Sequence, residues 1–140
     1  MWTSINNLDQ IVVKLLPMLS PESIKKCDNY GKNAFMFACY HNSDKVLELM
    51  FAKSQMINWD FNTQDRSFDR SRTGFIWACE RKKEKAVDLI LANYQRLKID
   101  LKIKDRLGLT GMDLWPEKFD GCVKSKSELN KDLLICNHFC

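Results

Sequence analysis

The chain has 140 residues, a length typical of one domain with a buried core. Its 45% hydrophobic and 29% charged residues, with five glycines and three prolines, exclude disordered and fibrous proteins and disfavour a many-turned β-sandwich. The net charge of +4 suits an acidic partner but is smaller than that of a dedicated nucleic-acid-binding domain.

Residues 1–27 contain one apolar segment, I-V-V-K-L-L at positions 11–16, which predicts a short amphipathic helix. The residues before it show no basic region followed by an apolar run of signal-peptide length. No stretch has the ~18 uninterrupted apolar residues of a transmembrane helix. We therefore expect an intracellular protein, cytoplasmic or nuclear, whose six cysteines are thiols in a reducing compartment.

The chain then repeats itself. Residues 33–39 read N-A-F-M-F-A-C and residues 73–79 read T-G-F-I-W-A-C, 40 residues later; T-G-M-D-L-W at 110–115 begins a third copy after a further 37. A polar turn and a second apolar helix follow the first two copies, at 45–51 and 85–91, and residues 11–16 match that second helix. Neither helix of a pair can bury its apolar face alone, so the units must stack.

These residues resemble the ankyrin repeat. The segment 28–39, D-N-Y-G-K-N-A-F-M-F-A-C, follows that family's D-x-x-G-x-T-P-L-H-x-A-A pattern, and residues 105–114 follow its opening. The resemblance spans roughly residues 8–115. It implies an all-α helix-turn-helix solenoid with extended finger loops and terminal capping helices. As one domain over 1–140, this divides into a partial N-terminal repeat (1–27), two repeats (28–64 and 65–104), a degenerate repeat start (105–115) and a C-terminal capping helix (116–140).

The sequence departs from the family pattern at several positions. The motif histidine is replaced by Met36, Ile76 and Asp113, which predicts fewer hydrogen bonds between neighbouring loops. The turn glycine between paired helices is Asn42 and then Lys82, and asparagine tolerates the left-handed conformation better than lysine. Segments 57–65 and 99–105 alternate apolar and polar residues, as extended hairpin arms do. Trp59 and Phe61 of the first arm either reach toward a partner or pack back on the array.

Residues 116–140 leave the repeat pattern. Pro116 is expected to end the preceding helix, and residues 127–136 can form an amphipathic helix that covers the last repeat. In the alternative, the chain is an adaptor or accessory subunit that presents Leu133, Leu134 and Ile135 of this helix to a partner.

Catalytic motifs are absent from the sequence, which has two histidines and none of the common nucleophile, phosphate-loop or zinc-protease patterns. Cys136-x-His138-x-Cys140 is better explained as a chain end than as a metal site. Cys39 and Cys79 occupy equivalent positions where a small side chain allows close packing. We therefore expect no enzymatic activity, no cofactor, no metal and no small-molecule substrate.

The resemblance places the partner-binding surface on the concave face, formed by the finger loops and the outer side of each first helix. The residues expected there are Asn29, Tyr30, Lys32, Tyr40, His41, Asp69, Arg70, Arg72, Glu80, Arg81, Arg106, Leu107 and Leu109. Residues 66–85 carry seven basic and three acidic side chains, an excess equal to that of the whole chain. This favours a cationic patch for an acidic peptide or protein surface, beside the alternative of a solvated charged face.

The expected function is thus protein–protein interaction without membrane contact. Nucleic acid is a less favoured partner, because acidic residues interrupt the basic ones. Short ankyrin arrays of infectious agents often engage host signalling or ubiquitin-ligase components, so the resemblance also implies a regulator of signalling or of a host.

Deleting residues 125–140 separates the two roles of the C-terminal helix. A cap covers the apolar face of the last repeat, so its loss should abolish cooperative unfolding in a urea titration followed by circular dichroism. A truncated chain that still unfolds cooperatively but no longer binds its partner would instead support the adaptor role.

Overall fold

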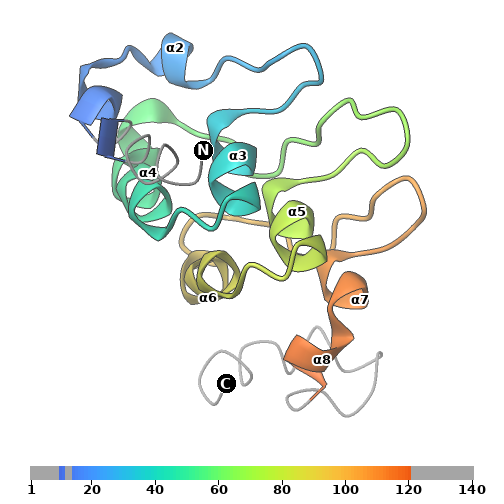
Figure 1. Cartoon of the computed structure of the whole chain (residues 1–140). Coiled ribbons are helices and arrows are strands. Elements are labelled where there is room, and N and C mark those ends of the chain that lie inside the picture. The colour runs from blue at the N-terminus through green and yellow to red at the C-terminus, as the bar shows by residue number, and fades with distance from the viewer. Residues whose placement is uncertain (1–9, 12–13, 121–140) are drawn as a thin grey trace.

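The computed structural model describes residues 10–11 and 14–120, and within them all regular structure is helical (Figure 1). The elements are η1 (Leu16–Met18), α2 (Pro21–Ile24), α3 (Ala34–Tyr40), α4 (Asp44–Ile57), α5 (Gly74–Glu80), α6 (Glu84–Asn93), α7 (Gly111–Leu114) and α8 (Pro116–Phe119). The first helices α3, α5 and α7 follow one another in a row, with α4 and α6 beside them and the finger loops projecting to one side. The all-α solenoid predicted from the repeats is confirmed. Within the described ranges no helix is long and apolar enough to span a bilayer.

The first helices all begin in the same way. The side chains of Asn33, Thr73 and Thr110 each accept a hydrogen bond from the backbone N–H three residues later, at 3.0, 3.2 and 3.2 Å. The Asp113 carboxylate in turn accepts a hydrogen bond from the backbone N–H of Thr110, which completes a capping box. A polar N-cap removes one of the unpaired N–H groups at a helix start, so the motif defines where each first helix begins.

Both turns between paired helices use the left-handed conformation. Asn42 has a φ of 59° and Lys82 a φ of 52°, so lysine takes the same strained geometry as asparagine. This geometry costs a non-glycine residue roughly 1 kcal/mol. The Asn42 side chain also accepts a hydrogen bond of 3.0 Å from the backbone N–H of Ala86, which links the first turn to helix α6 of the next unit.

Close approach of the first helices depends on two glycines. A Cβ atom at Gly74 would overlap the ring of Phe35, and one at Gly111 would lie 2.7 Å from the ring of Phe75. Each glycine stands where the family motif has proline, and each phenylalanine belongs to the preceding first helix. The array therefore has no room for a side chain at the start of α5 or α7.

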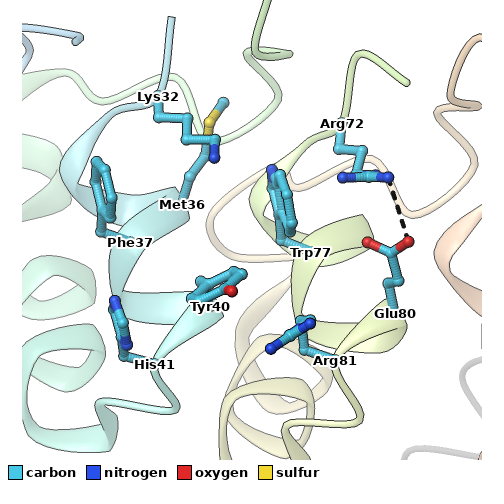
Figure 2. Close-up of a pocket in the computed structure, with 9 residues that line it drawn as sticks. All are labelled: Lys32, Met36, Phe37, Tyr40, His41, Arg72, Trp77, Glu80 and Arg81. Carbon is cyan, nitrogen blue, oxygen red and sulfur yellow. Dashed lines mark ion pairs between the residues drawn. The ribbon is translucent and has the colours of Figure 1, made fainter. Parts of the chain in front are cut away.

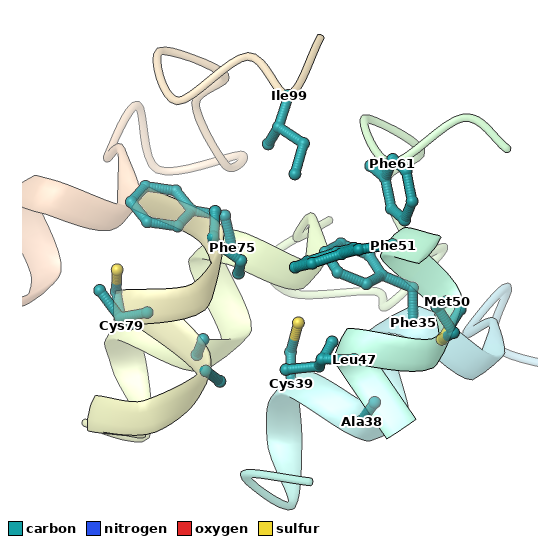
Figure 3. Close-up of a cluster of buried hydrophobic side chains, with 14 of the residues drawn as sticks. Phe35, Ala38, Cys39, Leu47, Met50, Phe51, Phe61, Phe75, Cys79 and Ile99 are labelled. Carbon is teal, nitrogen blue, oxygen red and sulfur yellow. The ribbon is translucent and has the colours of Figure 1, made fainter. Parts of the chain in front are cut away.

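The core continues along the second helices and the finger loops (Figure 3). Leu47 and Met50 of α4 are fully buried, as is Ile90 of α6. Trp59 and Phe61 are 8% and 3% exposed, and the Phe61 ring meets the Phe35 ring edge-on at 4.9 Å. This finger therefore packs back on the array instead of reaching toward a partner.

The alternation expected for the hairpin arms is present as alternate burial, although the arms are turns and not strands in the described residues. Ile99 and Leu101 are buried, whereas Asp100 and Lys102 between and beyond them are exposed. Neighbouring arms are joined through Asn62, which donates to the carbonyl of Lys98 and accepts from the N–H of Asp100. The side-chain amide of Asn62 thus forms hydrogen bonds between neighbouring loops, which the motif histidines form in the family pattern.

The last helices are anchored to the array by an ion pair. Pro116 is the first residue of α8, and the helix before it ends at Leu114, because proline disfavours helical geometry in the residue that precedes it. Lys118 of α8 places its Nζ 2.7 Å from Asp88 and 3.2 Å from Glu84 of α6. The predicted helix at 127–136 and the Cys136-x-His138-x-Cys140 cluster lie outside the described residues.

The substitution Gly74→Ala tests the packing of the first helices. Alanine is favoured over glycine inside a helix by about 1 kcal/mol, yet overlap with Phe35 should dominate and lower the free energy of unfolding by roughly 1–3 kcal/mol. Urea titration measures the change, with Glu48→Ala on the exposed side of α4 as a control expected within about 0.5 kcal/mol. Equal stability of Gly74→Ala and the wild type would contradict this packing.

Candidate functional site

A hollow of about 610 Å³ lies between the first helices α3 and α5 (Figure 2), on the side where the resemblance places the partner-binding face. Its volume falls in the range of ligand pockets. The residues that line it are Lys32, Met36, Phe37, Tyr40, His41, Arg72, Trp77, Glu80 and Arg81. We call this the concave hollow.

Aromatic rings with cations over their faces form the floor of the hollow. The rings of Tyr40 and Trp77 meet at 5.3 Å in a T-shaped arrangement. Lys32 Nζ lies 4.6 Å from the Trp77 ring centre, and the Arg72 guanidinium lies 4.3 Å from it. Arg81 lies 4.8 Å from the Tyr40 ring centre. Such cation–π contacts hold charged groups in place while leaving part of each group exposed.

The cations of this region differ in whether a carboxylate already pairs with them. Arg72 lies 3.2 Å from Glu80, and Arg70 lies 3.6 Å from Glu80 and 3.7 Å from Asp105. Within the described part of the chain, neither Lys32 nor Arg81 has a carboxylate within 4.0 Å. The unpaired positive charges of the hollow are therefore those of Lys32 and Arg81.

Arg72 is built into the wall of the hollow. It is 7% exposed, lies between the Trp77 ring and Glu80, and its Nε has no acceptor among the described residues. Replacing it would leave Glu80 without its nearest cation and uncover Trp77. Arg72 therefore supports the site more than it offers a free contact.

Asp65 positions the floor and the middle finger together. Its Oδ2 accepts a 2.8 Å hydrogen bond from the indole N–H of Trp77. Its Oδ1 accepts bonds from the backbone N–H of Arg72 at 2.8 Å and the hydroxyl of Ser67 at 2.7 Å. Because Asp65 is 2% exposed, these bonds form away from competing water.

The aspartates that open the other two fingers act on the backbone in a similar way. Asp28 Oδ1 accepts hydrogen bonds from the N–H groups of Tyr30 and Lys32, both at 2.9 Å. Asp105 Oδ1 accepts from the N–H groups of Leu107 and Leu109. The first residue of the D-x-x-G pattern thus shapes each fingertip by local hydrogen bonds.

Six of the predicted binding residues are brought together in the hollow: Lys32, Tyr40, His41, Arg72, Glu80 and Arg81. The other seven lie outside it, on the finger loops: Asn29, Tyr30, Asp69, Arg70, Arg106, Leu107 and Leu109. Of these seven, Arg70 and Leu109 are half-buried and the rest are exposed.

Four residues of this face were not among the predicted binding residues. Met36, Phe37 and Trp77 line the hollow, and Phe68 is 95% exposed on the middle finger. Phe37 and Trp77 both stand directly before the motif alanine. Phe37 is 42% exposed, whereas Trp77 is 8% exposed because Lys32, Arg72 and Tyr40 contact its ring. Phe68 lies in a loop three residues longer than the other two between its aspartate and the helix cap.

The sequence suggested that the positive charges of residues 66–85 form one patch. In the structure they lie at separate places. Arg72 and Arg81 line the hollow, while Lys82 and Lys83 lie at the turn between α5 and α6. Lys32, from the preceding repeat, supplies the other unpaired cation. The physical reason is that stacking combines residues of neighbouring repeats, so a charge count along one repeat misses this combination.

The thiols of Cys39 and Cys79 are fully buried. Burial raises the pKa of Cys39 and of Cys79 well above the ordinary value, and the neighbouring Cys79 also raises that of Cys39. A thiol of this kind stays protonated near neutral pH and is a poor nucleophile. Their positions against Gly74 and Gly111 fit the predicted role in packing.

The comparisons with known proteins agree with this fold. The family model for ankyrin repeats, in three copies, matches residues 1–105 of the 140. The chain therefore belongs to the ankyrin repeat family, whose members generally mediate protein–protein interaction and are typically not enzymes. Among curated proteins, no match to the chain was found.

Replacement of Asp65 tests the network under the site. Asp65→Ala removes the acceptor of four hydrogen bonds, from Trp77, Arg72 and both the N–H and the hydroxyl of Ser67, so the free energy of unfolding should fall by roughly 2–4 kcal/mol. Urea titration and the near-ultraviolet circular dichroism of Trp77 report the loss. Asp69→Ala, at an exposed position four residues later, is the control and should change stability by less than about 0.5 kcal/mol. Similar losses in both variants would argue against the network.

Proposed function

We propose that the chain is a non-catalytic interaction module that binds an acidic surface or peptide of a partner protein through its concave face and finger loops. The observation that carries this proposal is the pair of unpaired cations, Lys32 and Arg81, held against aromatic rings in the concave hollow. Opposite charge on a partner speeds its encounter with such a surface and selects it over others. The rings add contact area of the kind that dominates interface hot spots.

The rigidity of the fingers supports the same function. The backbone N–H of Arg66 donates to the carbonyl of Tyr30, and that of Arg106 donates to the carbonyl of Arg70, both at 2.6 Å. Adjacent fingertips are thereby joined before any partner arrives. A surface ordered in advance loses little conformational entropy on binding.

The fingertips extend the contact area beyond the hollow. Tyr30, Phe68 and Leu107 are 65%, 95% and 60% exposed, one on each of three successive fingers. An exposed aromatic or aliphatic side chain on an ordered loop gains free energy when a partner covers it. These residues are therefore proposed as secondary contacts around the hollow.

A protein partner is favoured over nucleic acid by the distribution of charge. Glu80 and Asp105 already neutralise Arg70 and Arg72, which breaks the basic surface between Arg81 and the fingertips. A nucleic-acid backbone needs a run of cations matched to successive phosphates. We also place the module inside the cell, since Cys27, Cys39 and Cys79 are free thiols.

Charge reversal at the two unpaired cations tests the proposal. Lys32→Glu and Arg81→Glu should each weaken binding of a partner captured from native cells by about tenfold, measured as Kd with purified proteins. These positions are preferable to Arg70 and Arg72, whose reversal would leave Glu80 and Asp105 beside a new acid.

Lys45→Glu is the matched control, because it makes the same charge change at an exposed position of α4 away from the hollow. Its Kd should stay within about twofold of the wild type. If Lys32→Glu and Arg81→Glu leave the Kd of every captured partner unchanged, partner binding does not use the concave face.

A further inference from the structure

We propose that the concave hollow recognises an extended peptide segment with two carboxylates four residues apart and an apolar side chain midway between them. This inference rests on the proposed function and specifies its partner. It comes from the order of groups along the hollow, from the apolar character of its middle and from its length.

The two unpaired cations lie at opposite ends of one row of contacts. Lys32 meets the Trp77 ring, Trp77 meets the Tyr40 ring, and Tyr40 meets Arg81. Lys32 directly precedes Asn33, the N-cap of α3, and Arg81 is the C-cap residue that follows α5 (Figure 2). Each ring occupies one side of its cation, so the remaining side of the cation is available to a carboxylate.

The middle of the row accepts an apolar group. The Phe37 side chain, 42% exposed, forms the wall opposite Trp77, and Met36 lies beneath the Lys32 end. No acidic side chain lies between the two cations among the described lining residues, since Glu80 is turned toward Arg72 on the far side of Trp77.

The contacts along the row limit the spacing of the carboxylates. They are 4.6 Å from Lys32 Nζ to the Trp77 ring, 5.3 Å from this ring to that of Tyr40 and 4.8 Å from the Tyr40 ring to Arg81, so the two cations are at most about 15 Å apart. An extended peptide rises about 3.3 Å per residue, and every second side chain points to the same face. Two acidic residues four positions apart, with an apolar residue midway, therefore present all three side chains to the hollow over about 13 Å.

The structure also favours an extended segment over a folded surface. Tyr40 and Trp77 line the floor between two neighbouring helices, and about 610 Å³ accommodates a few side chains. A peptide backbone can follow the direction of these helices while its side chains reach the floor. A broad, flat protein surface cannot enter a hollow of this size.

Short fluorescent peptides test the inference by anisotropy with the full chain. The probe has a Glu-Ala-Leu-Ala-Glu core in a Gly-Ser context, and its matched partner has the same residues in the order Glu-Glu-Ala-Leu-Ala. The spaced peptide should bind at least about tenfold more tightly, and replacement of leucine by serine or of both glutamates by glutamine should each weaken it by about tenfold.

Variants of the chain test whether Lys32 and Arg81 contact the peptide directly or only support the structure. Lys32→Glu and Arg81→Glu should each weaken the spaced peptide, whereas Lys45→Glu should not. A peptide with lysine in place of one glutamate should bind Lys32→Glu more tightly than it binds the wild type, and the two lysine positions reveal the direction of the peptide. Recovery by charge exchange requires direct contact between the groups.

Four results would overturn the inference: no binding of the spaced peptide at about 1 mM, equal binding of both glutamate orders, no recovery by charge exchange, or tighter binding of an oligouridylate of equal charge. Its failure can be told apart from that of the proposed function. If captured partners still lose affinity in Lys32→Glu and Arg81→Glu while the peptides do not discriminate, the concave face binds a partner of different shape.

Discussion

Close packing of successive first helices is the constraint on which the rest of this structure depends. Glycine at the start of α5 and of α7 lets each helix lie against the phenylalanine of the helix before it. Cys39 and Cys79 keep the same interface thin, because a thiol is small and behaves as an apolar group when buried. At this separation the side chains on the outer face of α3 and α5 come into contact, which brings Tyr40 to Trp77 and Lys32 to Trp77.

The polar groups of the middle repeat divide between supporting the site and forming it. Asp65 accepts hydrogen bonds from the backbone of Arg72 and from the indole of Trp77, and Arg72 forms an ion pair with Glu80. These contacts hold Trp77 in place. Buried polar groups of this kind destabilise the chain unless each finds a partner, so they are committed to the fold. Among the described residues, Lys32 and Arg81 have no carboxylate within 4.0 Å. This difference makes them the groups available for recognition.

Much of the fold could be predicted from the sequence because it is repeated. The spacing of the N-A-F-M-F-A-C and T-G-F-I-W-A-C segments gave the helix pairs, whereas the structure showed that the polar residue at the start of each segment caps its helix. The candidate site was predicted less completely. Arg70 and Arg72 were expected as contacts but pair with acidic groups, while Trp77, Phe37 and Phe68 were not among the predicted binding residues. Ion pairing and exposure depend on neighbours that are distant in sequence, which a linear pattern does not reveal.

The amino-acid sequence by itself determined the helical solenoid, its paired helices and the family, because these follow from apolar periodicity and from the repeated motif. It also located the face on which binding is expected. Tertiary structure decided which cations remain unpaired, that Trp59 and Phe61 pack inward, and that a hollow forms between α3 and α5. The reason is geometric: these properties arise from distances between side chains of different repeats, and those distances exist once the helices have stacked.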